Sequence, residues 1–173
     1  TAAADLATTE EMYFKVVRGK TAALFSAAME VGGVIAGADE DKLKALSAYG
    51  DALGISFQIV DDLLDYGGTD ATGKNIGDDF RERKLTLPII RAIAAADKNE
   101  QAFWKRTIGK GHQNSDDLDR AMSILDRHGA LASTRDTALS WADKAKAALA
   151  PIPDHELKSM LLDLSNYVVA RIT

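Results

Sequence analysis

The segment Leu53–Tyr66 sets the strongest limit on what this chain can fold into, because it is apolar on almost every side. The 4-3-4 spacing of one apolar set indicates a single helical stripe, formed by Leu53, Phe57, Val60 and Leu64. A second set covers much of the opposite side and consists of Ile55, Ile59 and Leu63. A helix that is apolar nearly all round is usually buried, so the segment predicts an interior helix.

Three aspartates, Asp61, Asp62 and Asp65, lie on this same helix. Asp61 and Asp65 are one turn apart and share a face with Gln58, whereas Asp62 lies about 100° away around the helix axis. A buried charge is costly unless it is neutralised, paired or bound to a metal. The alternative interpretation is an acid-rich helix end that faces solvent.

The ligand chemistry of these acids is that of a hard cation. Carboxylate oxygens without His or Cys suit Mg²⁺ better than Zn²⁺. Mg²⁺ typically takes only one or two protein carboxylates and completes its coordination with water and substrate phosphate. The acids therefore predict Mg²⁺-bridged binding of a substrate that carries phosphate.

Lysines near the acids give this prediction a second part. Lys74 and Lys84 lie in the charged segment that follows the helix, where a bound polyanion would explain them. Without a polyanion, the segment is an ordinary solvated loop. Lys20 is a further candidate, because it is the last charge before an apolar or neutral run that ends at Glu30. Its ammonium either faces inward or reaches solvent, as that of many lysines does.

The composition favours helices and argues against several other classes of protein. The only prolines are Pro88, Pro151 and Pro153, so long helices are permitted before Pro88. A net charge of −5 and the lack of a basic stripe argue against a general nucleic-acid binder. The absence of cysteine excludes disulfides and fits a reducing compartment. Residues 21–38 are too short and too rich in Ala and Gly for a good span, so we expect no membrane-spanning segment.

The predicted class is all-α, and capping residues set the expected helix bounds. Thr9 and Asp39 are predicted N-caps, and Gly129 is a predicted C-terminal stop. The first two helices are expected over residues 9–37, with a bend at Gly32–Gly33, and 39–67. Residues 69–84 are expected to form a loop. Further helices are expected at residues 86–97, 99–109, 116–128, 130–149 and 154–171.

Three separate motifs resemble those of the trans-isoprenyl diphosphate synthases. They are YFKVVRGKTAALF at residues 13–25, FQIVDDLLDY at residues 57–66 and GKNIGDDFRERKLTLP at residues 73–88. Their order and spacing are similar to those around the family's second aspartate-rich motif, and the resemblance continues to the closing YVVAR. The TLP is most similar to bacterial medium- and long-chain synthases of octaprenyl or decaprenyl type, which serve quinone side chains. The resemblance implies the helical bundle of the isoprenoid synthases.

The resemblance also assigns metal and diphosphate ligands. Asp61 would bind Mg²⁺ directly, and two further acids would bind it directly or through metal-bound water, namely Asp62 and Asp65. The allylic diphosphate would contact Lys20, Lys74 and, less directly, Lys84.

Further roles in the same motifs concern the reacting carbon and the loop. The Lys20 carbonyl, Thr21 and Gln58 would face the developing allylic cation, with Phe57 in a supporting position. Asp79 matches the family's aspartate between the Gly-Lys pair and the later lysine, with Asp78 as the neighbouring alternative. Arg83 stands where many relatives have Gly, which leaves the conformation of this loop open.

The reaction implied by the resemblance is extension of an allylic diphosphate by isopentenyl diphosphate. The family's first DDxxD motif and the cations that hold isopentenyl diphosphate belong to its N-terminal half, and we do not find them in this sequence. We therefore expect residues 1–173 to be the C-terminal part of a single synthase domain, inactive alone and with apolar surface exposed to its missing half. The whole protein is expected to be a cytoplasmic homodimer that binds no nucleic acid.

Other functions are compatible with parts of this pattern. A noncatalytic small or regulatory subunit of a heteromeric prenyl diphosphate synthase is the main alternative, although a purely structural subunit could lose the three acids. A terpene cyclase would share the Mg²⁺ chemistry but is disfavoured by the segment from Lys74 to the TLP. A plain helical bundle with surface acids would bind no diphosphate.

Overall fold

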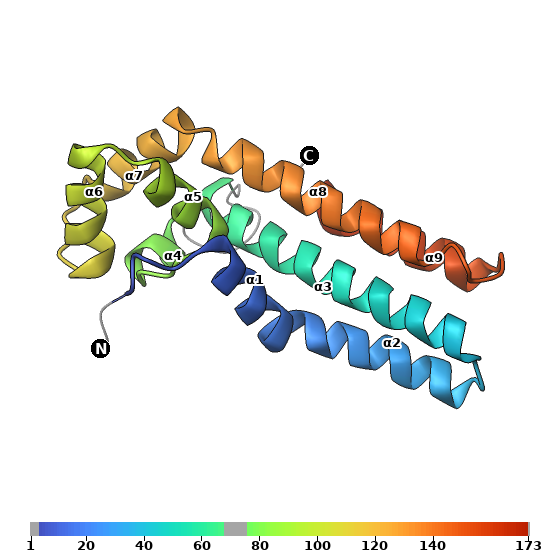
Figure 1. The fold of residues 1–173 in the computed structure, drawn as a ribbon. Coiled ribbons are helices and arrows are strands. Elements are labelled where there is room, and N and C mark those ends of the chain that lie inside the picture. The colour runs from blue at the N-terminus through green and yellow to red at the C-terminus, as the bar shows by residue number, and fades with distance from the viewer. Residues whose placement is uncertain (1–3, 68–75, 173) are drawn as a thin grey trace. The chain divides into compact units, whose positions relative to one another are not determined.

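A computed structural model describes residues 4–67 and 76–172, and the regular secondary structure in these ranges is helical (Figure 1). The all-α prediction is therefore confirmed. The elements in chain order are α1 (Glu10–Val17), η1 (Arg18–Ala22), α2 (Ala23–Ile35), α3 (Glu40–Gly67), α4 (Asp78–Arg81), α5 (Leu87–Ala95), α6 (Lys98–Trp104), η3 (Lys105–Gly109), α7 (Asp117–Arg127), α8 (Ala130–Ala148) and α9 (Glu156–Ala170).

The described residues divide into two compact units. Unit 1 comprises the chain up to Tyr13 together with Asp61–Thr134, and unit 2 comprises Phe14–Val60 and the chain from Arg135 onward. Helices α1, α3 and α8 each contribute residues to both units. Whether residues 1–173 form one domain stays a prediction.

Most predicted helix bounds agree with the structure within two residues. The caps explain this agreement, because each one pairs a terminal backbone group that a helix leaves without a partner. The Thr9 hydroxyl accepts the N–H of Met12 at 3.2 Å, and the Asp39 carboxylate accepts the N–H of Lys42 at 3.0 Å. Gly129 has a φ of 59°, the left-handed conformation that ends many helices.

Local structure differs from the prediction in two places. The first helix contains the π-helical turn η1, whereas α2 is uninterrupted at Gly32 and Gly33, and the bend expected there stays a prediction. The segment predicted as a loop contains the single helical turn α4 among its described residues. The turns η1 and α4 are each about one turn long. Whether such short helices form depends more on contacts with the rest of the fold than on local sequence.

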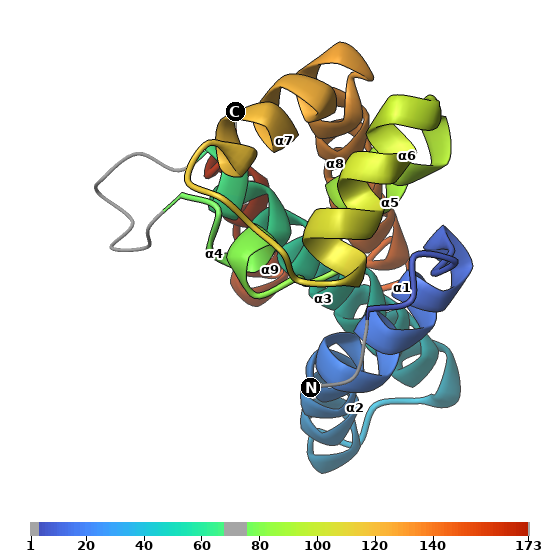
Figure 2. The same cartoon turned by 90° about the vertical axis from the view of Figure 1, so that its left-hand side faces the viewer.

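The core of unit 1 is an aromatic and aliphatic cluster between α5, α6, η3 and α7. Phe103 and Trp104 meet edge to face at 4.9 Å between ring centroids, and Phe80 of α4 lies 6.5 Å from Phe103. Tyr66, in the last turn of α3, belongs to the same cluster. Helix α5 packs against both α6 and α7 (Figures 1 and 2). This core supports the end of α3 that carries the aspartates.

In unit 2, α2 and α3 lie side by side at very short range (Figure 1). A Cβ added at Gly54 would lie 2.6 Å from the Cα of Ala22, which is closer than real Cβ contacts allow. One turn earlier, a Cβ at Gly50 would lie 2.6 Å from the carbonyl oxygen of Phe25. The two glycines therefore let η1 and the start of α2 approach α3, because no side chain separates the backbones.

Unit 2 also exposes large apolar side chains, most of them on α2 and α9. On α2 these are Leu24, Val31, Val34 and Ile35, the last with 82% of its surface exposed. On α9 they are Leu157, Met160, Leu164 and Tyr167. That these side chains pack against another half of a synthase domain stays a prediction. None of the helices in the described ranges combines the length and the apolar character that crossing a bilayer requires.

We predict that Gly54→Ala destabilises the protein by about 1–3 kcal/mol, because the new methyl group would push against the backbone of Ala22. Gly32→Ala is the matched control, since a Cβ at that helical position meets nothing within 4 Å and Ala is the better helix former. Urea unfolding of both variants measures the difference. Equal stability of the two variants would contradict the close approach of η1 to α3.

Candidate functional site

The three aspartates of α3 are not equivalent in their exposure to solvent. Asp62 and Asp65 are buried, with 5% and 3% of their surface exposed, whereas Asp61 is partly exposed. The apolar residues around them are buried as predicted, including Ile59, Val60 and Leu63. The alternative of a solvent-facing acidic helix end is therefore wrong for Asp62 and Asp65.

Asp62 accepts a hydrogen bond from a residue that the sequence analysis did not single out. The hydroxyl of Tyr13, on α1, donates to Asp62 Oδ2 at 2.6 Å, and both side chains are buried. Burial first, and then the negative charge of Asp62, raise the pKa of the Tyr13 hydroxyl, so it stays protonated and remains a donor. In the sequence, the feature that could have indicated Tyr13 is its position as the first residue of the YFKVVRGKTAALF motif.

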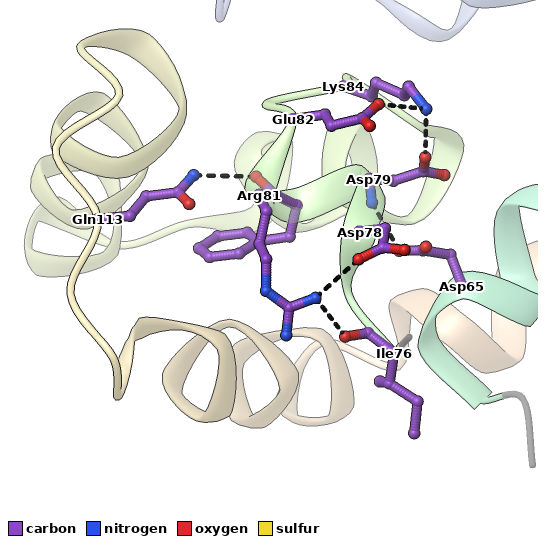
Figure 3. A network of polar contacts seen from close by, with 9 residues as sticks. Asp65, Ile76, Asp78, Asp79, Arg81, Glu82, Lys84 and Gln113 are labelled. Carbon is purple, nitrogen blue, oxygen red and sulfur yellow. Dashed lines mark hydrogen bonds and ion pairs between the residues drawn. The ribbon is translucent and has the colours of Figure 1, made fainter. Parts of the chain in front are cut away.

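Asp65 holds the end of α3 against the start of α4 through two hydrogen bonds, of which Figure 3 draws the one from Asp79. Its backbone carbonyl accepts the N–H of Gly77 at 2.8 Å, and its Oδ2 accepts the N–H of Asp79 at 3.0 Å. Gly77 can take this position because its φ of 81° is left-handed, which glycine adopts at little cost. The carboxylate thus pairs a backbone donor in the first turn of α4, where a helix favours negative charge.

Asp79 connects Asp65 to the lysine that the resemblance assigns to diphosphate. Asp79 Oδ1 accepts a hydrogen bond from Lys84 Nζ at 2.8 Å, and Glu82 lies 2.7 Å from the same nitrogen (Figure 3). The side-chain hydrogen bond to Asp79 is the largest cause that raises the pKa of Lys84, and the bond to Glu82 is the next. Lys84 therefore stays a cation. Asp78 instead pairs with Arg81 at 3.0 Å on an exposed surface. The geometry therefore distinguishes Asp79 from its neighbour.

Arg83 adopts the conformation that a glycine would favour. Its φ is 60°, and no other non-glycine residue in the described part of the chain has a positive φ. Its guanidinium lies over Gly111, where an added Cβ would meet Arg83 Nη1 at 3.0 Å. The loop thus keeps a left-handed turn at this position although the residue is arginine.

In unit 2, the structure brings together two of the predicted site residues. The Thr21 hydroxyl donates to Gln58 Oε1 at 2.9 Å, and both side chains are partly buried. Phe57 packs against Phe25 with 5.5 Å between ring centroids. Lys20 is exposed, so its ammonium reaches solvent in this chain.

Thr21 lies in the π-helical turn η1. Its contact with α3 is the hydrogen bond to Gln58. Lys74 lies outside the described residues.

The chemistry of the acids fits a hard divalent cation, although they do not form a complete cage. The donors are carboxylate oxygens, the class that Mg²⁺ and Ca²⁺ prefer. Within residues 4–67 and 76–172, no group of three or more His, Asp or Glu side chains is arranged to hold a metal ion. One or two carboxylates suffice for Mg²⁺ when a substrate phosphate completes the coordination, so this arrangement and the cation are compatible.

Comparison with known proteins shows the family to which the chain belongs. Residues 1–125 match the family model described as polyprenyl synthetase. The chain belongs to the polyprenyl synthetase family. It is 40% identical over 164 residues to the octaprenyl diphosphate synthase of Escherichia coli (strain K12), an alignment that covers 94% of this chain and 50% of the relative. The resemblance to bacterial long-chain trans-isoprenyl diphosphate synthases is therefore confirmed.

Solved structures of this family have the same fold. A decaprenyl diphosphate synthase from Rhodobacter capsulatus matches with a TM-score of 0.94 and 62% identity, over 99% of this chain and 53% of that one. A polyprenyl synthase from Caulobacter crescentus, complexed with calcium and isoprenyl diphosphate, matches with a TM-score of 0.92 and 45% identity, over 100% of this chain and 53% of that one. The chain spans about half the length of the relatives it matches.

We predict that Asp65→Ala destabilises the protein by about 1.5–3 kcal/mol, because the N–H of Asp79 would lose its charged acceptor. Faster amide exchange at Asp79 should accompany the loss. Asp78→Ala is the matched control, because its ion pair with Arg81 is exposed and worth about 0–1 kcal/mol. If the two variants unfold at the same denaturant concentration, Asp65 does not hold α4.

Proposed function

We propose that the protein containing this chain is a prenyltransferase that extends an allylic diphosphate with isopentenyl diphosphate in five-carbon steps. The observation that carries the proposal is the set of contacts around the buried acids of α3. Asp62 is held by Tyr13, and Asp65 is connected through Asp79 to Lys84. The chain belongs to a family whose named relatives are prenyl diphosphate synthases.

In this proposal the acids hold Mg²⁺, and the lysines neutralise the diphosphate. Asp61 would bind the metal directly, while Asp62 and Asp65 would bind it directly or through its waters. Mg²⁺ bound there would supply positive charge to the leaving diphosphate. Lys20, Lys74 and Lys84 would add ammonium charge to the same oxygens, which favours breaking of the allylic C–O bond.

Other residues would act on the carbon that becomes positive. Thr21 and Gln58 already form one hydrogen-bonded pair, and their oxygen atoms would face the allylic cation together with the Lys20 carbonyl. The isopentenyl double bond would then attack this carbon, and the released diphosphate would take the proton. This route requires no histidine or glutamate as a general base.

The size and partners of the whole protein are part of the same proposal. This chain would be the C-terminal half of one synthase domain, and the half with the first DDxxD motif would cover apolar surface that α2 and α9 expose here. We propose a homodimer that acts in the cytoplasm and makes a long quinone side chain. The noncatalytic-subunit alternative has no support among the named relatives, and the three acids argue against it.

We predict that this chain alone makes no polyprenyl product. It contains one of the two acidic motifs of the family, and the cations for isopentenyl diphosphate are not found in its sequence. The measurement is an assay with an allylic diphosphate, isopentenyl diphosphate and Mg²⁺, with the full-length protein as the positive control. Turnover by the isolated chain at the full-length rate would overturn the half-enzyme interpretation.

A second prediction separates the metal ligand from the lysine in the full-length enzyme. Asp61→Ala and Lys20→Ala should each lower kcat by about 10²–10³, because both contacts strengthen as charge develops on the leaving oxygen. Raising the Mg²⁺ concentration should partly rescue Asp61→Ala and leave Lys20→Ala unchanged, because only the first weakens metal binding. Near-normal kcat of Asp61→Ala at saturating Mg²⁺ would show that the acids are structural.

A further inference from the structure

We propose that Tyr13 is a positioning residue for the metal site: its hydroxyl fixes the carboxylate of Asp62 in the orientation that binds the cation. The inference rests on the proposed function, since it assumes that the acids of α3 hold a divalent cation. It concerns a residue outside the aspartate-rich motif. Tyr13 acts through Asp62 and touches neither the metal nor the substrate.

The contact itself is short, buried and formed across the chain. Tyr13 and Asp62 are 49 positions apart, yet the donor and acceptor oxygens lie 2.6 Å from each other. Tyr13 is 7% exposed and Asp62 is 5% exposed, so little water competes for either group. Hydrogen bonds to an ionised acceptor in such surroundings are shorter and stronger than bonds between neutral groups. With Oδ2 engaged, rotation of the carboxylate would break the bond.

Tyr13 is itself held in place by a second contact of α1. Glu10, three positions earlier, accepts two hydrogen bonds from Arg91 of α5, at 3.0 and 2.9 Å. This two-point pair fixes direction as well as distance. All four side chains belong to unit 1, so the anchor and the positioned carboxylate form one local framework. Such support is typical of residues that orient metal ligands.

Two other buried tyrosines show what a structural hydroxyl does in this fold. The Tyr49 hydroxyl donates to the backbone carbonyl of Leu161 at 2.8 Å. The Tyr66 hydroxyl lies 3.4 Å from that of Thr86. Both contacts pair a polar group that folding would otherwise bury without a partner. Tyr13 differs because its acceptor is one of the acids that the family motif assigns to metal.

The test compares two Tyr→Phe variants of the full-length protein, each of which removes one buried hydroxyl. The readout is the dissociation constant for Mn²⁺, measured by electron paramagnetic resonance in the presence of inorganic diphosphate. Tyr13→Phe should weaken Mn²⁺ binding by about 10–100-fold, the usual cost of removing the partner of a metal ligand. Tyr49→Phe should leave Mn²⁺ binding within about twofold, because no acid accepts its hydrogen bond.

The outcomes separate this inference from the proposed function. An unchanged Mn²⁺ affinity in Tyr13→Phe, or an equal loss in both variants, would overturn the positioning role. If Tyr13→Phe weakens Mn²⁺ binding but the wild-type protein makes no prenyl product, the positioning role holds and the proposed function fails. Should Tyr13→Phe not fold, 3-fluorotyrosine at position 13 keeps the hydroxyl, and its ¹⁹F resonance should shift on addition of Mg²⁺ and diphosphate. An unshifted resonance would contradict the role.

Discussion

Two buried carboxylates on an apolar helix are the constraint on which the rest of this structure depends. Taking Asp62 and Asp65 out of water costs free energy that hydrogen-bond donors must offset. The fold supplies these donors from different elements, the Tyr13 hydroxyl of α1 and the backbone N–H of Asp79 in α4. The first helix and the short helix after α3 are therefore both positioned by the acids they contact.

The three aspartates differ in their exposure and in their contacts with the protein. Asp62 and Asp65 are buried and oriented by the protein, whereas Asp61 is partly exposed one position away. A carboxylate with access to solvent can exchange water for a hydrated cation, and its fixed neighbours can orient the waters of that cation. The connection from Asp65 through Asp79 to Lys84 then couples the acidic end of α3 to a cation suited to phosphate.

Much of this arrangement could be predicted from sequence, because it depends on the spacing of apolar residues and on the residues that cap helices. The apolar residues of Leu53–Tyr66 indicated a buried helix, and Thr9 and Asp39 marked helix starts that the structure confirms. Thr21 and Gln58 are hydrogen-bonded to each other, and the common role that the resemblance assigned to them stays a prediction. The different exposure of Asp61 and Asp62 could not be predicted, since a helix apolar all round does not indicate which side meets its neighbours.

The missed features depend on contacts between distant segments. The π-helical turn at Arg18–Ala22, the single turn α4 and the bond from Tyr13 to Asp62 each require partners many residues away. The left-handed φ of Arg83 could not be predicted from conformational propensities either, because these favour glycine at such a position. Sequence periodicity describes one element at a time, so it places residues on a face but does not identify what that face touches.

The most direct test of the central claim is a crystal structure of the full-length protein with Mg²⁺ and an unreactive allylic diphosphate analogue. The account predicts a metal ion about 2.0–2.1 Å from a carboxylate oxygen of Asp61, bridged to the diphosphate, with Asp62 still bonded to Tyr13. A diphosphate bound without metal contact to the aspartates of α3 would contradict it.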